Sequence, residues 1–387
     1  MWYGNKFLTV FSMSMLVFSF IACSPRQTAA PEPAVRQQPA EKAPVKAGWE
    51  AEWEQVQKDA RKEGKVVLYA IVGADIRDAL ATAMKKYGIE LESMGGRGNE
   101  IAEKVIRERK AGIYTADMYI SGITSLLTQI KPAGAMAPIE PLLILPDAKD
   151  PKNWYKGQIP YSDKDKTVLA FAAYPNGDFH VNTNVVKPGD LKSMMDLLNP
   201  KWEGKIIMDD PTVAGRGNNV VAAYTIRLGE DYIRQLAKQK PVVTRDRRQA
   251  IDWVVKGSHP IGIGIYPDAF AEYQRAGAPI GSILFNEAAF LDAGAGFVTY
   301  FDKAPHPNAA RVLFNWLLSK EGQLTWSKLA NAQSARLDVP TDHLNVEGVH
   351  LREPGVDYLE AAKESWVLEL KPKAEKGFME TFMALRK

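Results

Sequence analysis

The sequence has little cysteine, and it lacks both dense basic stretches and, beyond its start, long apolar runs. Cys23 is the only cysteine among 387 residues, so no disulfide can form within the chain. The net charge is only +3 and the basic residues are not clustered. Nucleic-acid binding is therefore not expected, because phosphate recognition requires grouped lysines and arginines. No apolar run after residue 23 reaches the length of a membrane span.

The sequence also lacks the short motifs that mark common catalytic sites. It contains no G-x-S-x-G nucleophile turn, no H-E-x-x-H zinc helix and no G-x-G-x-x-G dinucleotide loop. The histidines are scattered and none accompanies a serine or cysteine in such a motif: His180, His259, His306, His343 and His350. We therefore do not expect an enzyme.

The first 23 residues have the pattern of a secretory signal. Lys6 is the only charge among them, and residues 7–22 are apolar or small. The segment ends in Phe20-Ile21-Ala22-Cys23, which resembles a bacterial lipobox, although that pattern prefers leucine where Phe20 stands. We predict an exported protein that is acylated at Cys23 and held at a membrane surface. The alternative is an ordinary buried cysteine.

A proline-rich segment separates this signal from the globular body. Residues 24–48 contain five prolines and no aromatic side chain. Such a composition cannot bury enough apolar surface to order itself, and proline keeps it extended. We interpret residues 24–48 as a tether between the lipid and the body.

The body has two units in which predicted strands and helices alternate, which indicates an α/β fold with parallel sheets. We predict a first lobe over 49–176 with 290–320 returning to it, a second lobe over 177–289, and a C-terminal helical segment over 321–387. The extended stretches that could cross between the lobes are 168–173, 177–182 and 297–301.

Five segments in this order give the chain a family resemblance. They read EGKVVLYA, IAEKVIRERKAGIYTADMYISG, FHVNTNVV, PKWEGKIIMDDPTVAGRG and APHPNAARVLFNWLLSKEGQ. The sequence resembles the extracellular solute-binding proteins of ABC importers, in the cluster that includes ferric iron, thiamine, polyamine and phosphonate binders. The resemblance implies a type II-like periplasmic-binding-protein fold with a ligand cleft between two lobes and a hinge of crossing strands. It also implies a membrane permease as partner, and we expect a monomer without a cofactor.

Two similar turns suggest where a ligand would bind. Gly95-Gly96-Arg97-Gly98-Asn99 and Ala214-Gly215-Arg216-Gly217-Asn218 each precede a predicted helix, with asparagine as the expected N-cap. A helix N-terminus offers unpaired N–H groups, glycine allows close approach, and arginine suits a carboxylate or phosphate. We therefore predict a small organic anion held by Arg97, Gly98, Asn99, Arg216, Gly217 and Asn218. The alternative is that these glycines only form turns and the arginines are solvated.

Other predicted contacts follow from position. Ser121 and Gly122 come after a strand, at the sheet edge where open α/β sheets bind ligands. Tyr266 and the apolar Ile71 would contact the uncharged part of the ligand. Ferric iron is the alternative cargo, with oxygen ligands from Tyr266, Asp268 and Tyr119. A second alternative is a binding protein that presents its ligand to a receptor for sensing.

Overall fold

The computed structural model describes residues 48–344 and 348–385, with the backbone alone at 267–269, 271 and 385. The predicted signal segment with Cys23, and the predicted tether except Gly48, lie outside the described residues. Within the described part of the chain, no helix is both long and apolar enough to cross a bilayer.

The first sheet has the strand order β2-β1-β3-β13-β4, and β5 also pairs with β13. β1 runs parallel to β2 and β3, whereas β13 is antiparallel to β3, β4 and β5. The prediction of a parallel sheet was therefore right for three strands only, because β13 enters the sheet from the opposite direction. The strands are β1 (Lys65–Ala70), β2 (Glu90–Gly95), β3 (Met118–Ser121), β4 (Met136–Ala137), β5 (Val168–Ala170) and β13 (Phe297–Phe301).

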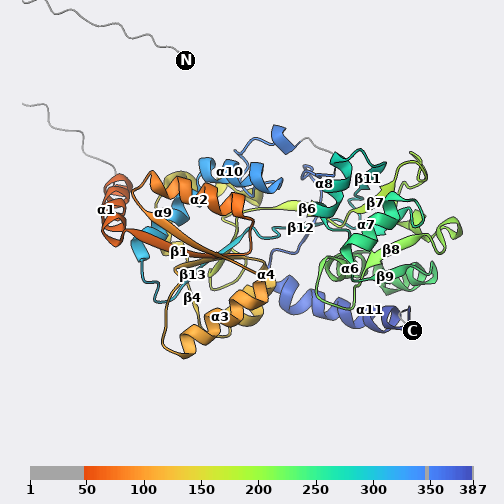
Figure 1. The fold of residues 1–387 in the computed structure, drawn as a ribbon, viewed down its shortest axis with the longest axis horizontal. Coiled ribbons are helices and arrows are strands. Elements are labelled where there is room, and N and C mark those ends of the chain that lie inside the picture. The colour runs from red at the N-terminus through yellow and green to blue at the C-terminus, as the bar shows by residue number, and fades with distance from the viewer. Residues whose placement is uncertain (1–47, 345–347, 386–387) are drawn as a thin grey trace, which may run out of the picture. The chain divides into compact units, whose positions relative to one another are not determined.

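Helices cover both faces of the first sheet, and Figure 1 shows α2 on one side of it and α3 on the other. This cover explains why the residues of β1 after Lys65 are all buried and read as an uninterrupted apolar run. The helices of this lobe are α1 (Gly48–Glu63), α2 (Ala74–Lys85), α3 (Gly98–Lys110), α4 (Ile123–Ser125), the π-helical turn η1 (Leu126–Ile130), α5 (Pro146–Lys149), α9 (Pro307–Leu318) and α10 (Lys320–Ala330).

One buried carboxylate joins the first sheet to α9. Asp117 is fully buried and accepts hydrogen bonds from the N–H of Val67 (2.7 Å) and from the N–H (2.7 Å) and Nδ1 (3.0 Å) of His306. Burial raises the pKa of Asp117, and these donors oppose that shift. His306 therefore has a structural partner at the entrance to α9.

The second sheet has the order β11-β7-β10-β8-β9 and is also mixed. β8 is parallel to β9 and β10, and β7 is antiparallel to β10 and β11. Apolar side chains of α7 and α8 pack on this sheet around Ile207. Its elements are β7 (Phe179–Asn182), β8 (Ile206–Asp209), α6 (Arg216–Lys238), β9 (Val242–Thr244), α7 (Arg247–Val255), β10 (Ile261–Ile263), α8 (Pro267–Arg275) and β11 (Ile280–Ile283).

The lobes are connected by short strands that the sequence did not reveal. β6 (Tyr174–Asn176) and β12 (Phe290–Asp292) pair antiparallel, and β14 (Leu359–Glu360) adds to β12. The predicted crossing stretches instead belong to the sheets: 168–170 and 297–301 to the first, 179–182 to the second. Pro175 lies within β6, and a proline inside so short an extended segment hides its strand character.

The chain ends in helical structure. The π-helical turn η8 (Trp366–Leu370) leads directly into α11 (Lys371–Leu385). Phe378 and Phe382 of α11 are fully buried, and the helix packs along α6 of the second lobe.

Candidate functional site

The ends of the parallel strands of the first lobe bring several predicted residues together. Ser121, which ends β3, is fully buried and its hydroxyl lies 3.0 Å from that of Ser125. The hydroxyl of Tyr119 donates to the carbonyl of Gly98 at 3.1 Å. A Cβ on Gly98 would lie 3.4 Å from the hydroxyl oxygen of Ser125. Gly98 and Ser121 therefore belong to one small polar cluster. Its hydroxyl groups are hydrogen-bonded to other groups of the protein.

Arg97 and Asn99 differ from that cluster because both side chains are exposed. The predicted N-cap at Asn99 was wrong, since α3 begins at Gly98 with Arg97 as its N-cap. The reason is the glutamate three residues after Arg97: the N–H of Arg97 donates to the Glu100 carboxylate at 3.5 Å, as in a capping box. Of the other predicted contacts, Ile71 is half-buried after β1, and Gly122 precedes α4.

Arg216 lies in a network of buried polar groups. Its guanidinium donates to Asp178 at 2.5 Å, and the carboxylate of Asp178 also accepts from the hydroxyl of Ser282 at 2.9 Å. Nε2 of His350 lies 2.9 Å from that hydroxyl, and Nε2 of His180 lies 3.5 Å from the carboxylate. Asp178 is only 4% exposed. Arg216 is thus held in a fixed orientation by a residue that the sequence did not suggest.

Burial and charge set the ionisation of this network. Burial acts to raise the pKa of Asp178, but Arg216 and His180 hold it below its ordinary value. Burial lowers the pKa of His180 to about 4, and it also lowers the pKa of His350. Both imidazoles are therefore neutral near pH 7, while Asp178 is ionised and paired with Arg216.

The start of α6 is satisfied from within the protein. The N–H of Gly217 donates to the Asp209 carboxylate at 2.9 Å, and the side-chain amide of Asn218 donates to the Pro211 carbonyl at 2.8 Å. A Cβ on Gly217 would meet the Asp209 carbonyl oxygen at 2.3 Å, so glycine is required there. Because α6 already begins at Arg216, the predicted N-cap at Asn218 was wrong.

Tyr266 lies beside the same helix end. Its hydroxyl accepts from the backbone N–H of Arg216 at 3.3 Å. The guanidinium of Arg247, the first residue of α7, lies 3.6 Å from the centre of the Tyr266 ring. Arg247 follows strand β9 and begins helix α7, just as Arg216 begins helix α6. This position at a helix start is the sequence signal that could have identified Arg247 as a candidate binding residue.

A cavity of about 720 Å³ extends from Arg216 between the lobes. Asp75 of α2 and Asn331 after α10 line its first-lobe side. Hinge and second-lobe residues line the rest, among them Tyr174, Asn176, Asp178, His180, Arg216, Phe270, Gln274 and His350. Among the predicted ligand-binding residues whose side chains the structure describes, only Arg216 lines it. Within the described structure, the buried Nε of Arg216 and Nδ1 of His180 have no hydrogen-bond partner.

Comparison with known proteins agrees with this architecture. A family model described as bacterial extracellular solute-binding protein matches residues 78–347, well over half of the chain. The chain belongs to the bacterial extracellular solute-binding proteins. A curated relative of this solute-binding protein is an uncharacterized protein of Haemophilus influenzae, 28% identical over 164 residues. That match covers 39% of this chain and 45% of the relative, so the chain spans less than half of the relative's length.

Solved structures share the fold. They include Trichodesmium IdiA (FutA) in complex with iron and citrate ligands (TM-score 0.62, 18% identity, 82% of this chain and 99% of that chain). AfuA of Actinobacillus pleuropneumoniae, with fructose-6-phosphate bound, has a TM-score of 0.55 at 21% identity and covers 81% and 98%. Iron-bound HitA of Pseudomonas aeruginosa has a TM-score of 0.53 at 18% identity and covers 83% and 99%. The predicted two-lobed periplasmic-binding fold is confirmed.

Tyr119, one of the alternative metal ligands of this solute-binding protein, is already engaged within the first lobe. The hydroxyl of Tyr119 is bonded to Gly98, and its ring stacks on Phe301. Burial raises the pKa of Tyr119, which disfavours the phenolate that binds ferric iron. The side chain of Asp268 lies outside the described residues. Among the side chains that are described, no three histidines, cysteines or acids are grouped to hold a metal.

Proposed function

We propose that this solute-binding protein captures a small organic anion between its lobes and delivers it to an ABC-type permease, without chemical change to the ligand. The observation that carries the proposal is the inter-lobe cavity at Arg216. Its volume of about 720 Å³ suits a small organic ligand. Both lobes contribute to its walls, so a bound molecule would draw them together.

Arg216 is the proposed anchor for the anionic group, which would be a carboxylate, phosphonate or sulfonate. Asp178 fixes the orientation of the guanidinium, and the 13% of the Arg216 side chain that remains exposed is available to a ligand in the cavity. His180 lines the same wall, and its buried Nδ1 has no hydrogen-bond partner in the described structure, although buried polar groups normally have one. Phe270 gives the cavity an apolar surface for the uncharged part of the ligand.

Arg97 and Asn99 are proposed to join the ligand from the first lobe when the lobes close. Both are exposed at the start of α3 and are therefore accessible to a ligand. Arg247 is proposed to act from the second lobe, held by its stacking on Tyr266. The bound AfuA structure supports an anionic organic cargo, since its ligand is a sugar phosphate.

A thermal-shift screen of organic acids, sugar phosphates, phosphonates and ferric salts tests the class of ligand, because binding to the native state raises the melting temperature. We expect an organic anion to stabilise the protein. Arg97→Ala and Arg247→Ala should each weaken its binding by at least about tenfold, or 1.4 kcal/mol. Arg248→Ala is the matched control, because Arg248 neighbours Arg247 but lies over Tyr273. If Arg97→Ala and Arg247→Ala bound the anion as tightly as the parent and Arg248→Ala do, the proposed roles of Arg97 and Arg247 would be contradicted.

Ferric iron is the second candidate cargo. Tyr266 supplies one oxygen beside the cavity wall, and the iron-bound relatives named above support the idea. Citrate alone and ferric citrate separate the two possibilities in the same assay. Stabilisation by ferric citrate but not by citrate, and its loss in Tyr266→Phe, would favour iron over the organic anion.

The proposal includes a lipid on Cys23 that holds a monomeric body outside the cytoplasmic membrane, with residues 24–48 as a tether. A role in sensing would use the same two lobes. Genes for a permease and an ATPase beside this one would support import, whereas a neighbouring sensor kinase gene would support sensing.

A further inference from the structure

The C-terminal arm, defined as residues 359–385, contacts both lobes and the hinge between them. It begins in the hinge sheet, where β14 pairs with β12. Trp366 then stacks on Phe290 of β12, with ring centres 5.7 Å apart and an interplanar angle of 14°. The arm therefore follows the crossing strands before it reaches the second lobe.

The first part of the arm is fastened to the first lobe. The Glu364 carboxylate accepts from Lys131 at 2.9 Å, and the backbone N–H of Glu364 donates to the Ser162 carbonyl at 2.8 Å. The ammonium of Lys363 donates to the Tyr161 carbonyl at 2.9 Å. These contacts join residues 363 and 364 to loops far away in the sequence.

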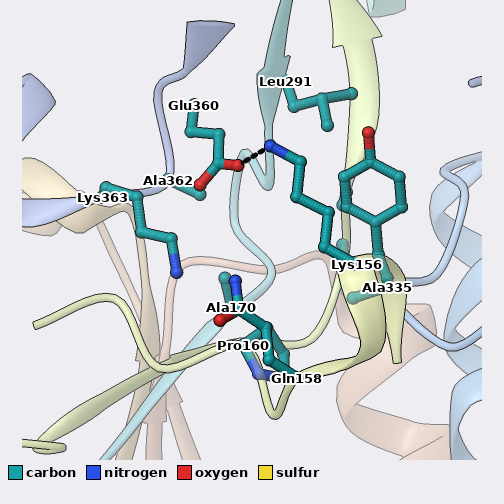
Figure 2. A pocket seen from close by; sticks show the side chains of 12 residues that line it. Lys156, Gln158, Pro160, Ala170, Leu291, Ala335, Glu360, Ala362 and Lys363 are labelled. Atoms are coloured by element: carbon teal, nitrogen blue, oxygen red, sulfur yellow. Dashed lines mark hydrogen bonds and ion pairs between the residues drawn. The ribbon is translucent and has the colours of Figure 1, made fainter. Parts of the chain in front are cut away.

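Figure 2 shows the same joint from close by, with Lys156 of the first lobe paired to Glu360 of the arm. Small side chains, including Ala170, Ala335 and Ala362, leave a cavity of about 50 Å³ around it. The joint is thus formed by ion pairs and backbone hydrogen bonds around a void, which leaves it room to shift.

The second part of the arm is fastened to the second lobe. α11 packs along α6, where it buries Phe378 and Phe382 completely. The approach is close: a Cβ on Gly377 would lie 2.6 Å from the carboxylate of Glu230 on α6. This anchor is an apolar helix pair, and it moves with the second lobe.

Residues 365–370 separate the two lobe anchors, and within them the buried Trp366 is packed on β12 of the hinge. Ser365 is exposed, and Trp366–Leu370 form the π-helical turn η8. Single π-helical turns are irregular points in a helix and often coincide with functional positions. We infer that the arm is a strap across the hinge, and that its length between the anchors sets the resting angle of the lobes.

The inference follows from the positions of the anchors. Rotation of the lobes about β6 and β12 changes the distance and angle between α11, which is fixed to the second lobe, and Glu364, which is fixed to the first. Residues 365–370 must therefore bend or stretch. Their resistance favours one angle over others, and a ligand that binds a different angle has to overcome it. The strap would in this way set the fraction of the ligand-free protein that is in the binding-competent conformation.

The test measures lobe separation without any ligand. Spin labels are placed at the exposed positions Lys58→Cys and Lys256→Cys, one in each lobe, in the full chain with Cys23→Ser, and their distance distribution is recorded by pulsed electron paramagnetic resonance. Two glycines inserted between Glu364 and Ser365 lengthen the strap and leave the side-chain contacts of both anchors in place, although they interrupt the backbone hydrogen bonds from Trp366 and Val367 to the Lys363 carbonyl. We expect a broader distribution with a shifted centre. The same insertion after Gly112, in an open turn of the first lobe, should leave the distribution unchanged.

A second variant tests the joint at constant length. Glu360→Gln with Glu364→Gln weakens the attachment to the first lobe and should shift the distribution in the same direction as the insertion. Glu321→Gln is the control, because its ion pair with Lys86 lies within the first lobe. Parent-like distributions in both arm variants, with parent-like melting temperatures, would overturn the strap. An equal broadening by the Gly112 insertion would do so too.

Discussion

Removal of the Arg216 guanidinium should destabilise the fold, because the buried carboxylate of Asp178 would lose the positive charge that compensates it. Arg216→Met keeps most of the apolar stem of the side chain and removes the guanidinium 2.5 Å from Asp178. Asp178 is 4% exposed and would remain as a buried charge whose neighbouring imidazoles are neutral. Breaking a buried pair in this way costs about 3–5 kcal/mol. At roughly 2 °C for each kcal/mol, the melting temperature should fall by about 6–10 °C.

The pH dependence of this loss separates the unpaired charge from lost packing. In the parent, Arg216 keeps the pKa of Asp178 below its ordinary value, so the pair persists as the pH falls from neutral. In Arg216→Met, burial is no longer opposed by the guanidinium, and the folded-state pKa of Asp178 should rise above the unfolded value of about 3.9. The deficit should then be full above the raised pKa and shrink as the pH falls toward about 4.5.

The assay is thermal unfolding of parent and variant between about pH 7 and pH 4.5; in the parent, His180, with a pKa of about 4, is mostly neutral over this range. The double variant Asp178→Asn, Arg216→Met removes the charge and should recover much of the lost stability at pH 7. A deficit that does not change with pH, together with no recovery in the double variant, would refute the account of this network.

Three further results are expected. Asp117→Ala should destabilise the protein by about 2–4 kcal/mol in chemical denaturation, because buried donors lose their acceptor, whereas a loss below about 0.5 kcal/mol would contradict that role. Gly264→Ala should cost more than Gly277→Ala in melting temperature: both have φ near +75° (74° and 79°), but only the Cβ at 264 would meet backbone, at 2.9 Å from the Gly217 Cα. Mass spectrometry of the mature protein should find an acylated N-terminal Cys23, and a different, unmodified N-terminus would disprove lipid anchoring.

The sheets and their covering helices could be predicted because burial leaves a direct mark on sequence. Val66, Val67 and Leu68 are buried between helices on both faces, so the strand reads as an apolar run. The hinge left no such mark, since β6 is three residues long and contains Pro175. Its extended conformation depends on pairing with β12, more than a hundred residues later, and local patterns carry no information on that pairing.

The candidate site shows the same division. Position after a strand and before a helix located Arg216, which does line the cavity. Its partner Asp178 could not be predicted, because the ion pair arises only when the second lobe brings β7 and the start of α6 together. The expected N-caps Asn99 and Asn218 were wrong because each helix begins earlier, where Glu100 caps one end and Asp209 bonds the other.

The placement of β13 has a consequence for how the chain folds during synthesis and export. β13 (Phe297–Phe301) lies between β3 and β4, so the first sheet cannot be completed until residue 301 has left the ribosome or the export channel. The second sheet has all its strands between residues 179 and 283 and can therefore close first. Until β13 pairs with β3, the edge of β3 exposes unpaired backbone groups, which are prone to pair with other chains. Chaperones or rapid translocation would therefore protect the N-terminal part of such a chain until residue 301 is available.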